Sequence, residues 1–216
     1  ANILYKLNRF NEAIDNYKIS IELSEPNAYV YFKISKCFKK LQKRKLFQEF
    51  IKKSIRLEPG NEKVWIYFIK FYLKNNNLRQ SNYLISKAIL NNNNSVKLLE
   101  LNALILFRIG DKQKAISFYN KIIELNGDIS WRMWKGLIEC LMYTKNWDEL
   151  LKKSLRAKKS FPNKTFLDYI ISGCLLKSGK INEAVYFYQN GQKKSRLPKK
   201  ILKYFPEFSD NKTLLV

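Results

Sequence analysis

Residues 9–14 read Arg-Phe-Asn-Glu-Ala-Ile, and residues 180–185 read Lys-Ile-Asn-Glu-Ala-Val. Related phrases occupy residues 111–116 and 146–151. Aligning the phrases gives one anchor position in each of six repeats, at successive intervals of 34, 34, 34, 35 and 34 residues. The anchors are Ala13, Phe47, Ser81, Ala115, Leu150 and Ala184. A fixed period of this length indicates a repeat architecture.

Each period contains two amphipathic helical segments. In the third repeat, apolar residues recur at helical spacing over residues 64–72 and again over residues 84–89, with a polar break at residues 74–77. Gly110 and Gly179 occupy the same break in other repeats, where glycine suits a helix C-terminus. The second segments end near Pro26, Pro59, Gly127 and Pro162. Only 7 Gly and 5 Pro occur in 216 residues, which also favours an all-α chain.

The small and aromatic positions within each period resemble the tetratricopeptide repeat. Matches to its first aromatic are Tyr31, Trp65 and Trp134; matches to its second-helix Ala and aromatic include Ala13 with Tyr17, Ala115 with Tyr119 and Ala184 with Tyr188. The resemblance implies an all-α, right-handed α-solenoid of about six helix hairpins. Phe47 and Leu150 depart from the pattern because they are large where Ala is usual, and Asp168 replaces the first aromatic.

The register divides the chain into a repeat array over residues 1–196 and a C-terminal capping helix and tail over residues 197–216. The predicted terminal helix spans Leu197 to Phe205 and starts at Pro198. Residues 1–7 correspond to only the second half of a first helix, so the first repeat is incomplete. We therefore expect further residues before Ala1 in the full protein.

The composition is strongly basic, with 41 Lys and Arg against 18 Asp and Glu and a formal net charge of +23. This charge favours an anionic partner. The abundance of Lys, Asn, Ile, Phe and Tyr also fits the bias of an AT-rich genome, and both interpretations stay open. The three cysteines form no disulfide framework and indicate a reducing compartment, which we expect to be the cytoplasm. No apolar run approaches the length of a membrane span.

The sequence offers little chemistry, and we expect no enzyme, no cofactor and no metal site. It contains no His, which excludes histidine-based acid–base catalysis and histidine-liganded metals within this chain. Residues 173–180 miss the phosphate-binding loop motif in spacing, and no strand precedes them. Cys37, Cys140 and Cys174 share one repeat position and are expected to be buried structural thiols.

In the resembled family, the first helix of each hairpin lines the concave face. We call the corresponding positions the groove stripe. The predicted ligand groove consists of Tyr29, Lys33, Lys36, Lys40, Lys63, Tyr67, Lys70, Lys74, Lys97, Arg108, Arg132 and Lys135. Glu100, Glu139 and Tyr143 lie on the same stripe. Glu100 and Glu139 are expected to bind a cationic ligand side chain rather than to catalyse a reaction.

These features predict a protein–protein interaction scaffold that binds an acidic or extended partner segment in a basic groove. One alternative is a helical repeat protein that binds RNA or another polyanion. Another is a non-catalytic repeat domain of a larger transferase. Two further basic clusters, at residues 39–45 and 152–159, are expected to be solvated helix faces or contacts to a nucleic acid or an anionic membrane.

Overall fold

A computed structural model of the chain describes residues 1–126 and 129–209, and it divides into two compact units, Ala1–Asn102 and Ala103–Val216. Every regular element in the described ranges is helical, which confirms the all-α prediction. The division falls inside one helix, α7 (Val96–Ile109). The boundary that the sequence suggested near residue 196 stays a prediction.

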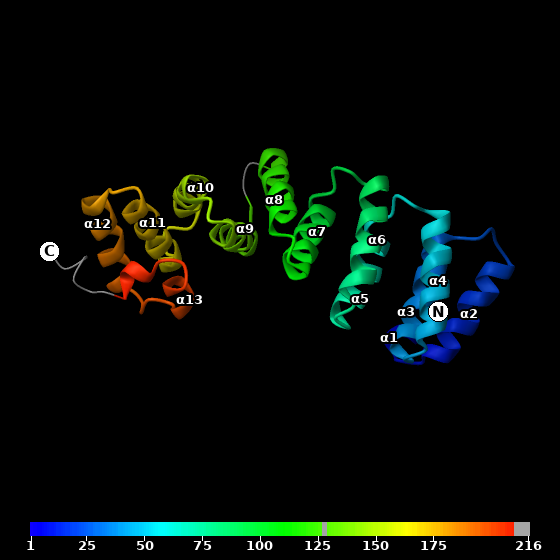
Figure 1. The fold of residues 1–216 in the computed structure, drawn as a ribbon. Helices are drawn as coiled ribbons and strands as arrows, with labels where there is room; N and C mark the ends of the chain where they lie inside the picture. The colour runs from blue at the N-terminus through cyan, green and yellow to red at the C-terminus, as the bar shows by residue number, and fades with distance from the viewer. Residues whose placement is uncertain (127–128, 210–216) are drawn as a thin grey trace. The chain divides into compact units, whose positions relative to one another are not determined.

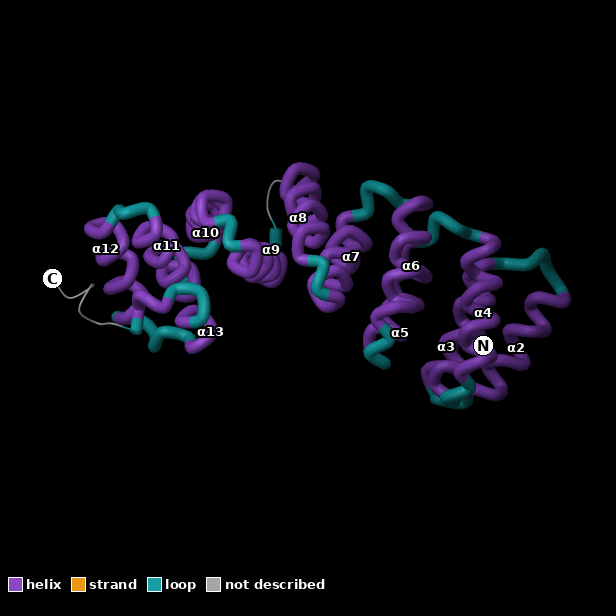
Figure 2. Tube along the Cα trace, in the orientation of Figure 1, coloured by secondary structure: helices purple, strands orange, loops and turns teal. Residues whose placement is uncertain are grey.

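The N-terminal unit consists of successive helix pairs joined by short turns (Figures 1 and 2). Its helices are α1 (Asn2–Lys6), α2 (Phe10–Glu22), α3 (Ala28–Lys40), α4 (Arg44–Leu57), α5 (Glu62–Lys74), α6 (Leu78–Asn91) and the first half of α7. Each odd-numbered helix is the first of its hairpin and each even-numbered helix is the second.

The C-terminal unit continues the same alternation. After the second half of α7 it contains α8 (Lys112–Asn126), α9 (Trp131–Thr144), α10 (Trp147–Ser160), α11 (Thr165–Lys177), α12 (Ile181–Gln192), the short helix α13 (Lys199–Leu202) and the 3₁₀ turn η1 (Pro206–Phe208). Gly127, expected at the end of a second helix, lies outside the described residues, as does the tail from residue 210 onward.

The turn inside each hairpin repeats the 34-residue period in the backbone. One residue of each turn adopts positive φ, and these residues are Asn8, Gln42, Asn76, Gly110, Lys145 and Gly179. Several of these turns also contain a backbone hydrogen bond that spans five residues, for example from the Lys43 N–H to the Phe38 carbonyl at 2.9 Å. This arrangement is a common way to end a helix, because it satisfies carbonyl groups of the last turn.

Asparagine side chains begin several of the helices. Asn27 accepts a hydrogen bond from the Tyr29 backbone N–H, and Asn77 and Asn146 cap α6 and α10 in the same way. A side-chain oxygen at this position satisfies an N–H group that has no partner within the helix. Part of the unusual asparagine content of the chain therefore marks helix starts.

The six anchor positions form the centre of the packing between helices. Ala13, Phe47, Ser81, Ala115, Leu150 and Ala184 are all fully buried. The departure at Phe47 is accommodated by an aromatic group, since its ring centroid lies 4.5 Å from that of Phe71 and 5.8 Å from that of Phe68. Large residues at two of the six anchors thus change local packing without changing the fold.

Asp168, which replaces the expected aromatic residue, is compensated by a cation. Its carboxylate is 3% exposed and lies 2.7 Å from the Lys158 ammonium group of the preceding helix. The same ammonium group donates a hydrogen bond to the Pro162 carbonyl. A buried charge of this kind is tolerated only when it is paired and hydrogen-bonded.

The end of the chain differs from the predicted terminal helix over residues 197–205. Regular helix is restricted to α13, and the backbone turns at Lys203 and Tyr204 before η1 begins at Pro206. The reason is the burial of Phe205, whose side chain is fully enclosed. The chain leaves the helical path and buries this ring against α11, where Gly173 leaves room for it.

Candidate functional site

Lysine and aromatic side chains of α1, α3 and α5 gather around Lys36 in the N-terminal unit. The Lys36 ammonium nitrogen lies 5.3 Å from the ring centroid of Tyr5 in α1. It also lies 5.6 Å from the ring centroid of Phe32 in α3 and 5.9 Å from that of Tyr67 in α5. The first helices of three successive hairpins therefore contribute rings to a single cation.

Lys39 extends this arrangement by one helical turn. Its ammonium nitrogen lies 4.0 Å from the Tyr67 ring centroid and 5.8 Å from that of Phe71. Phe32 meets Tyr67 edge-on at 5.3 Å, which links the rings of α3 and α5. An ammonium group over an aromatic face is attracted by the negative charge density of the ring. The rings thus hold both lysines in place.

Tyr29 and Lys33 lie at the start of α3 on the same face. The Lys33 ammonium nitrogen is 4.9 Å from the Tyr29 ring centroid, and the hydrogen bond that Lys33 donates to the Tyr29 oxygen lowers the pKa of that hydroxyl. Asn2 adjoins this edge, since a hydrogen bond with its side chain also lowers the pKa of the Tyr29 hydroxyl, and its side-chain oxygen accepts a 2.7 Å hydrogen bond from the Tyr17 hydroxyl. Polar and aromatic groups of α1, α2 and α3 therefore border the lysines.

We refer to this set of side chains as the lysine–aromatic cluster. Its members are Tyr5, Tyr29, Phe32, Lys33, Lys36, Lys39, Tyr67 and Phe71. All except Tyr29 are partly buried, while Tyr29 is half exposed. The cluster contains no carboxylate.

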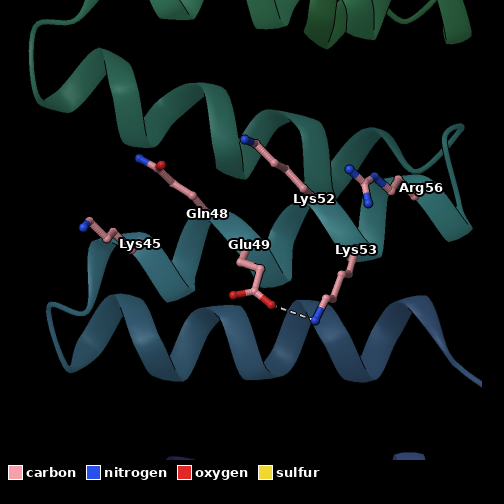
Figure 3. A pocket seen from close by; sticks show the side chains of 6 residues that line it. All are labelled: Lys45, Gln48, Glu49, Lys52, Lys53 and Arg56. Carbon is pink, nitrogen blue, oxygen red and sulfur yellow. Dashed lines mark hydrogen bonds and ion pairs between the residues drawn. The ribbon is translucent and has the colours of Figure 1, made fainter.

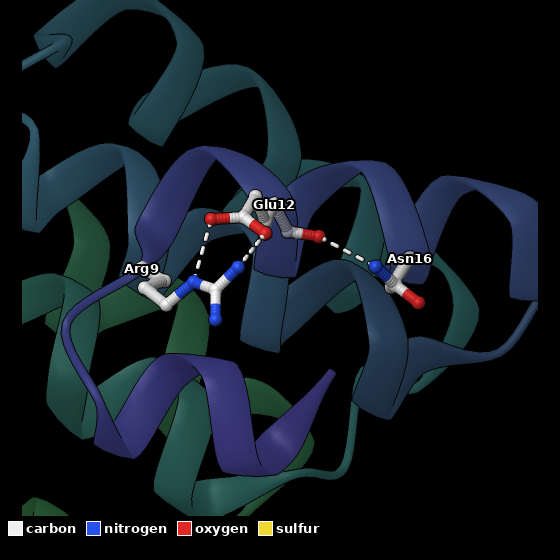
Figure 4. A network of polar contacts seen from close by, with 3 residues as sticks. All are labelled: Arg9, Glu12 and Asn16. Carbon is white, nitrogen blue, oxygen red and sulfur yellow. Dashed lines mark hydrogen bonds and ion pairs between the residues drawn. The ribbon is translucent and has the colours of Figure 1, made fainter.

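Three acidic residues of the N-terminal unit form ion pairs outside the cluster. Glu12 binds the Arg9 guanidinium group and its backbone carbonyl accepts a hydrogen bond from Asn16 (Figure 4). Glu49 pairs with Lys53 and Glu62 pairs with Lys97. Within residues 1–102, no ion pair involves a lysine of the cluster.

The uncompensated charge alters the acidity of the cluster. Burial lowers the pKa of Lys36, and the charge of Lys33 lowers it further. Burial likewise lowers the pKa of Lys39, with contributions from Lys74 and Lys40. Several cations thus repel one another in a partly desolvated place, and a bound anion would relieve that repulsion.

This arrangement is suited to binding rather than to catalysis. Lysine ammonium groups donate charge-assisted hydrogen bonds to carboxylates. The thiol nearest to the cluster is Cys37, which is fully buried, and burial raises its pKa to about 11. A buried, protonated thiol is a poor nucleophile.

Only some of the predicted groove residues come together. The cluster contains Tyr29, Lys33, Lys36 and Tyr67. Lys40, Lys63, Lys70 and Lys74 lie on the same two helices, α3 and α5, and are exposed. Lys97 is drawn into an ion pair with Glu62. The remaining predicted groove residues belong to the C-terminal unit and are exposed there: Arg108, Arg132 and Lys135.

Sequence reasoning missed four members of the cluster. Phe32 and Lys39 flank Lys36 at intervals of four and three residues, so all three share one helical stripe. Phe71 follows Tyr67 by one helical turn. This periodicity could have added them to the groove. Tyr5 carried no such signal, because the predicted groove positions began in the second repeat.

The outer face of α4 forms a second basic surface (Figure 3). A shallow hollow there is lined by Lys45, Gln48, Glu49, Lys52, Lys53 and Arg56, all from this one helix. Figure 3 shows the long side chains spread along the helix rather than converging on a point. This geometry fits a solvated helix face, the first of the two expectations for the basic cluster nearby.

The other motifs singled out in the sequence lie in the C-terminal unit. Residues 173–180 form the end of α11 and its turn, with Gly179 at a φ of 74°, so they are not a phosphate-binding loop. Cys140 and Cys174 are fully buried, as predicted, and burial raises the pKa of each thiol to about 12. Glu139 pairs with Lys200 at 2.8 Å, so its cationic partner in this structure belongs to the same chain.

The described residues contain neither a metal-binding cluster nor a membrane-spanning helix. No group of three or more His, Cys, Asp and Glu residues is arranged to hold a metal ion in residues 1–126 and 129–209. In the same ranges, no helix combines the length and the apolar character that crossing a membrane requires.

Comparison with known proteins supports the repeat assignment. A tetratricopeptide-repeat family model matches residues 28–61 and 97–129. No curated protein matches the sequence. The crystal structure of MamA aligns with a TM-score of 0.64 at 16% identity, covering 79% of this chain and 98% of MamA. YrrB, described as a tetratricopeptide-repeat protein with an unusual peptide-binding site, aligns with a TM-score of 0.64 at 14% identity, covering 92% of this chain and 95% of YrrB.

A larger protein shares the same fold over part of its length. Yeast Tom70 aligns with a TM-score of 0.53 at 19% identity, covering 92% of this chain and 42% of Tom70. At these identities the alignments describe the fold alone. Residues 28–61 and 97–129 thus match the tetratricopeptide-repeat family model, and most of the chain shares the fold of tetratricopeptide-repeat proteins.

Proposed function

We propose that this chain is a non-catalytic protein-interaction scaffold that binds an acidic, extended segment of a partner protein across the lysine–aromatic cluster. The observation that carries the proposal is the meeting of three partly buried lysines with aromatic rings and no carboxylate. Charges in such surroundings gain more from an anionic ligand than solvated lysines do.

The cluster favours a carboxylate-bearing peptide over a single-stranded nucleic acid. Base stacking requires an open aromatic face. Here Lys39 lies over the Tyr67 ring at 4.0 Å, and Lys36 is directed at the rings of Tyr5 and Phe32. The ammonium groups therefore occupy the ring faces and present positive charge to a ligand.

The fold supports a peptide partner. The chain shares its architecture with YrrB, whose peptide-binding site is described as unusual. Side chains of α1, α3 and α5 meet at the cluster, so an extended segment could contact several hairpins at once. We propose that this interaction takes place in the cytoplasm, in keeping with free, reduced cysteines.

The proposal is tested by fluorescence anisotropy with a labelled peptide in which glutamates alternate with serines. We expect Lys36→Gln combined with Lys39→Gln to weaken binding roughly 100-fold, because each charge-assisted contact contributes about 1.5–3 kcal/mol. The matched control is Lys45→Gln combined with Lys52→Gln, which removes the same charge from the outer face of α4.

The control variant and a competitor distinguish attraction by net charge from binding at the lysine–aromatic cluster. Equal losses in both double variants would mean that net charge alone attracts the peptide, and the proposed site would then be wrong. Single-stranded RNA is added as the competitor. Displacement of the peptide by RNA at physiological salt, with RNA binding lost in the cluster variant, would favour the nucleic-acid function instead.

A further inference from the structure

Residues near the C-terminus contact the predicted groove stripe of the last two repeats. In Figure 1, α13 and the turns that follow it lie beside α11 and α12. Three apolar side chains of this segment are buried: Ile201, Phe205 and Phe208. We call residues 198–208 the C-terminal segment.

The repeat register shows which surface the segment occupies. Glu139 lies on the predicted groove stripe, and Gly173 is its equivalent one repeat later, 34 residues on. Lys177 is likewise the equivalent of Tyr143. The C-terminal segment contacts three positions of the groove stripe, Glu139, Gly173 and Lys177.

These contacts differ from those of a helix that merely continues the stack. In a repeat array each repeat touches only its immediate neighbours. The C-terminal segment instead reaches back past the last hairpin. Lys200 pairs with Glu139 of α9 at 2.8 Å, and the Phe205 ring lies 5.3 Å from the Trp147 ring at the start of α10. The segment therefore contacts the first helices of two hairpins, on the stripe where the resemblance places a ligand.

The surface under the segment is shaped for an aromatic side chain. A Cβ atom at Gly173 would lie only 2.4 Å from the Phe205 ring, so the absence of a side chain at this position creates the space. Trp147 forms one wall, and the Lys177 ammonium nitrogen lies 5.8 Å from the Phe205 ring centroid. Gly173 occupies the repeat position that Lys36 occupies in the second repeat. Because glycine has no side chain, this position leaves space for the Phe205 ring.

The rest of the segment is recognised through its side chains. Glu207 forms a 2.7 Å ion pair with Lys177, and the Phe208 ring stacks on Tyr188 with centroids 5.1 Å apart. Among the described residues, the backbone groups of the segment form backbone hydrogen bonds only within residues 198–209. Examples are the bonds from the Phe205 N–H to the Ile201 carbonyl and from the Phe208 N–H to the Phe205 carbonyl. The segment can therefore leave without opening a backbone hydrogen bond of α9 or α11.

We propose that the C-terminal segment is a tethered ligand of a second peptide-binding groove. This groove accepts a segment of the pattern aromatic–Pro–Glu–aromatic, here residues 205–208, and a partner protein that carries the same pattern displaces the tethered copy. Tethering gives the segment a high effective concentration, so the groove opens only to a partner that competes with it. The inference is independent of the lysine–aromatic cluster, which lies in the other unit.

The test uses the full chain and a labelled synthetic peptide with the sequence of residues 197–209. We expect Phe205→Ala combined with Phe208→Ala to bind this peptide at least about tenfold more tightly than the unaltered chain, because the variant lacks its tethered competitor. The matched control is Tyr186→Ala, which removes an exposed aromatic ring from α12 of the same unit. A peptide with both phenylalanines replaced by alanine should bind neither protein.

Two results of this binding experiment would overturn the proposal. One is a folded double variant, by circular dichroism, that binds the peptide no better than the control does. The other is a concentration-dependent dimer of the unaltered chain that the peptide dissociates, since the groove would then take the segment of a second copy rather than a partner's.

Hydrogen exchange of the unaltered chain keeps the test decisive if the double variant does not fold. We expect amides of residues 199–208 to exchange while those of α11 stay protected, because the segment leaves on its own. Simultaneous loss of protection in the segment and in α11 would make the segment a structural cap, and the proposal would be wrong.

Discussion

At the scale of single residues, a nearly buried ion pair replaces the aromatic packing that the repeat pattern predicts. Asp168 takes the place of an aromatic residue, and its nearly buried carboxylate is balanced by Lys158. Removing one partner of such a pair leaves the other charge without compensation in a place that water hardly reaches. The pair therefore matters more to stability than the exposed ion pairs do.

We expect Asp168→Asn to lower the free energy of unfolding by about 2 kcal/mol, less than for a fully enclosed pair because Lys158 retains some contact with water. Urea denaturation followed by circular dichroism measures the change. Glu49→Gln, which breaks the exposed pair with Lys53, serves as the control and should cost less than about 0.5 kcal/mol. Similar losses in the two variants would contradict the importance given to burial.

At the scale of elements, α11 is buried almost all round, with nine consecutive buried residues from Leu167 to Leu175. A helix that is apolar on every side needs cover on every side. Its neighbours α10 and α12 cover most of its surface, and Phe205 of the C-terminal segment covers the face around Gly173. The sequence of α11 is thus adapted to the segment that follows it.

Gly173→Ala tests this adaptation. The added methyl group would meet the Phe205 ring, so we expect a loss of about 1–3 kcal/mol in unfolding free energy despite the better helix propensity of alanine. The matched control is Gly60→Ala, where no atom lies within 4 Å of the added group. Combining Gly173→Ala with Phe205→Ala should cost less than the sum of the single changes; additive losses would mean that the two residues do not interact.

At the scale of the whole molecule, the net charge of +23 acts on folding and on binding in opposite directions. Repulsion among like charges destabilises the compact state, and salt screens it. Attraction between the lysine–aromatic cluster and an acidic peptide is screened in the same way.

We expect the melting temperature to rise between low salt and about 0.5 M salt, while the affinity for the glutamate peptide falls. Differential scanning fluorimetry and anisotropy titrations on the same samples measure both. The cluster variant should keep the rise in melting temperature and lose most of the salt dependence of binding. A peptide affinity that does not change with salt would contradict an electrostatic site.

Alkaline pH probes the buried thiols and phenols. Burial raises the pKa of Cys37 to about 11, that of Cys140 and Cys174 to about 12, and that of Tyr67 to about 12. In the unfolded chain these thiols ionise near pH 9 and the phenol near pH 10. Between those values and pH 11–12 the unfolded state binds fewer protons than the folded state, so stability falls as pH rises.

We expect the urea midpoint to be nearly constant from pH 7 to 8.5 and to decline steadily above pH 9. Cys140→Ala should make the decline shallower, since one of the shifted groups is removed. Denaturation series at several pH values measure the slope. A midpoint that stays flat to pH 11 would show that the thiols ionise equally well in the folded chain.

The period, the helix pairs and the all-α class followed from the sequence alone, because spacing along the chain determines which side chains share a helix face. The six anchors are evenly spaced, and each of them is fully buried. The burial of Cys37, Cys140 and Cys174 was predicted from the family resemblance, in which the repeat position that they share faces a neighbouring helix.

Tertiary structure alone decided which of the predicted groove residues lie together. The periodicity placed Lys36 and Lys97 on one stripe, yet Lys36 lies among aromatic rings while Lys97 pairs with Glu62. It also decided that Phe205 fills the space above Gly173. These outcomes depend on contacts between residues distant in the sequence, and a one-dimensional pattern describes the face of a helix but not what packs against it.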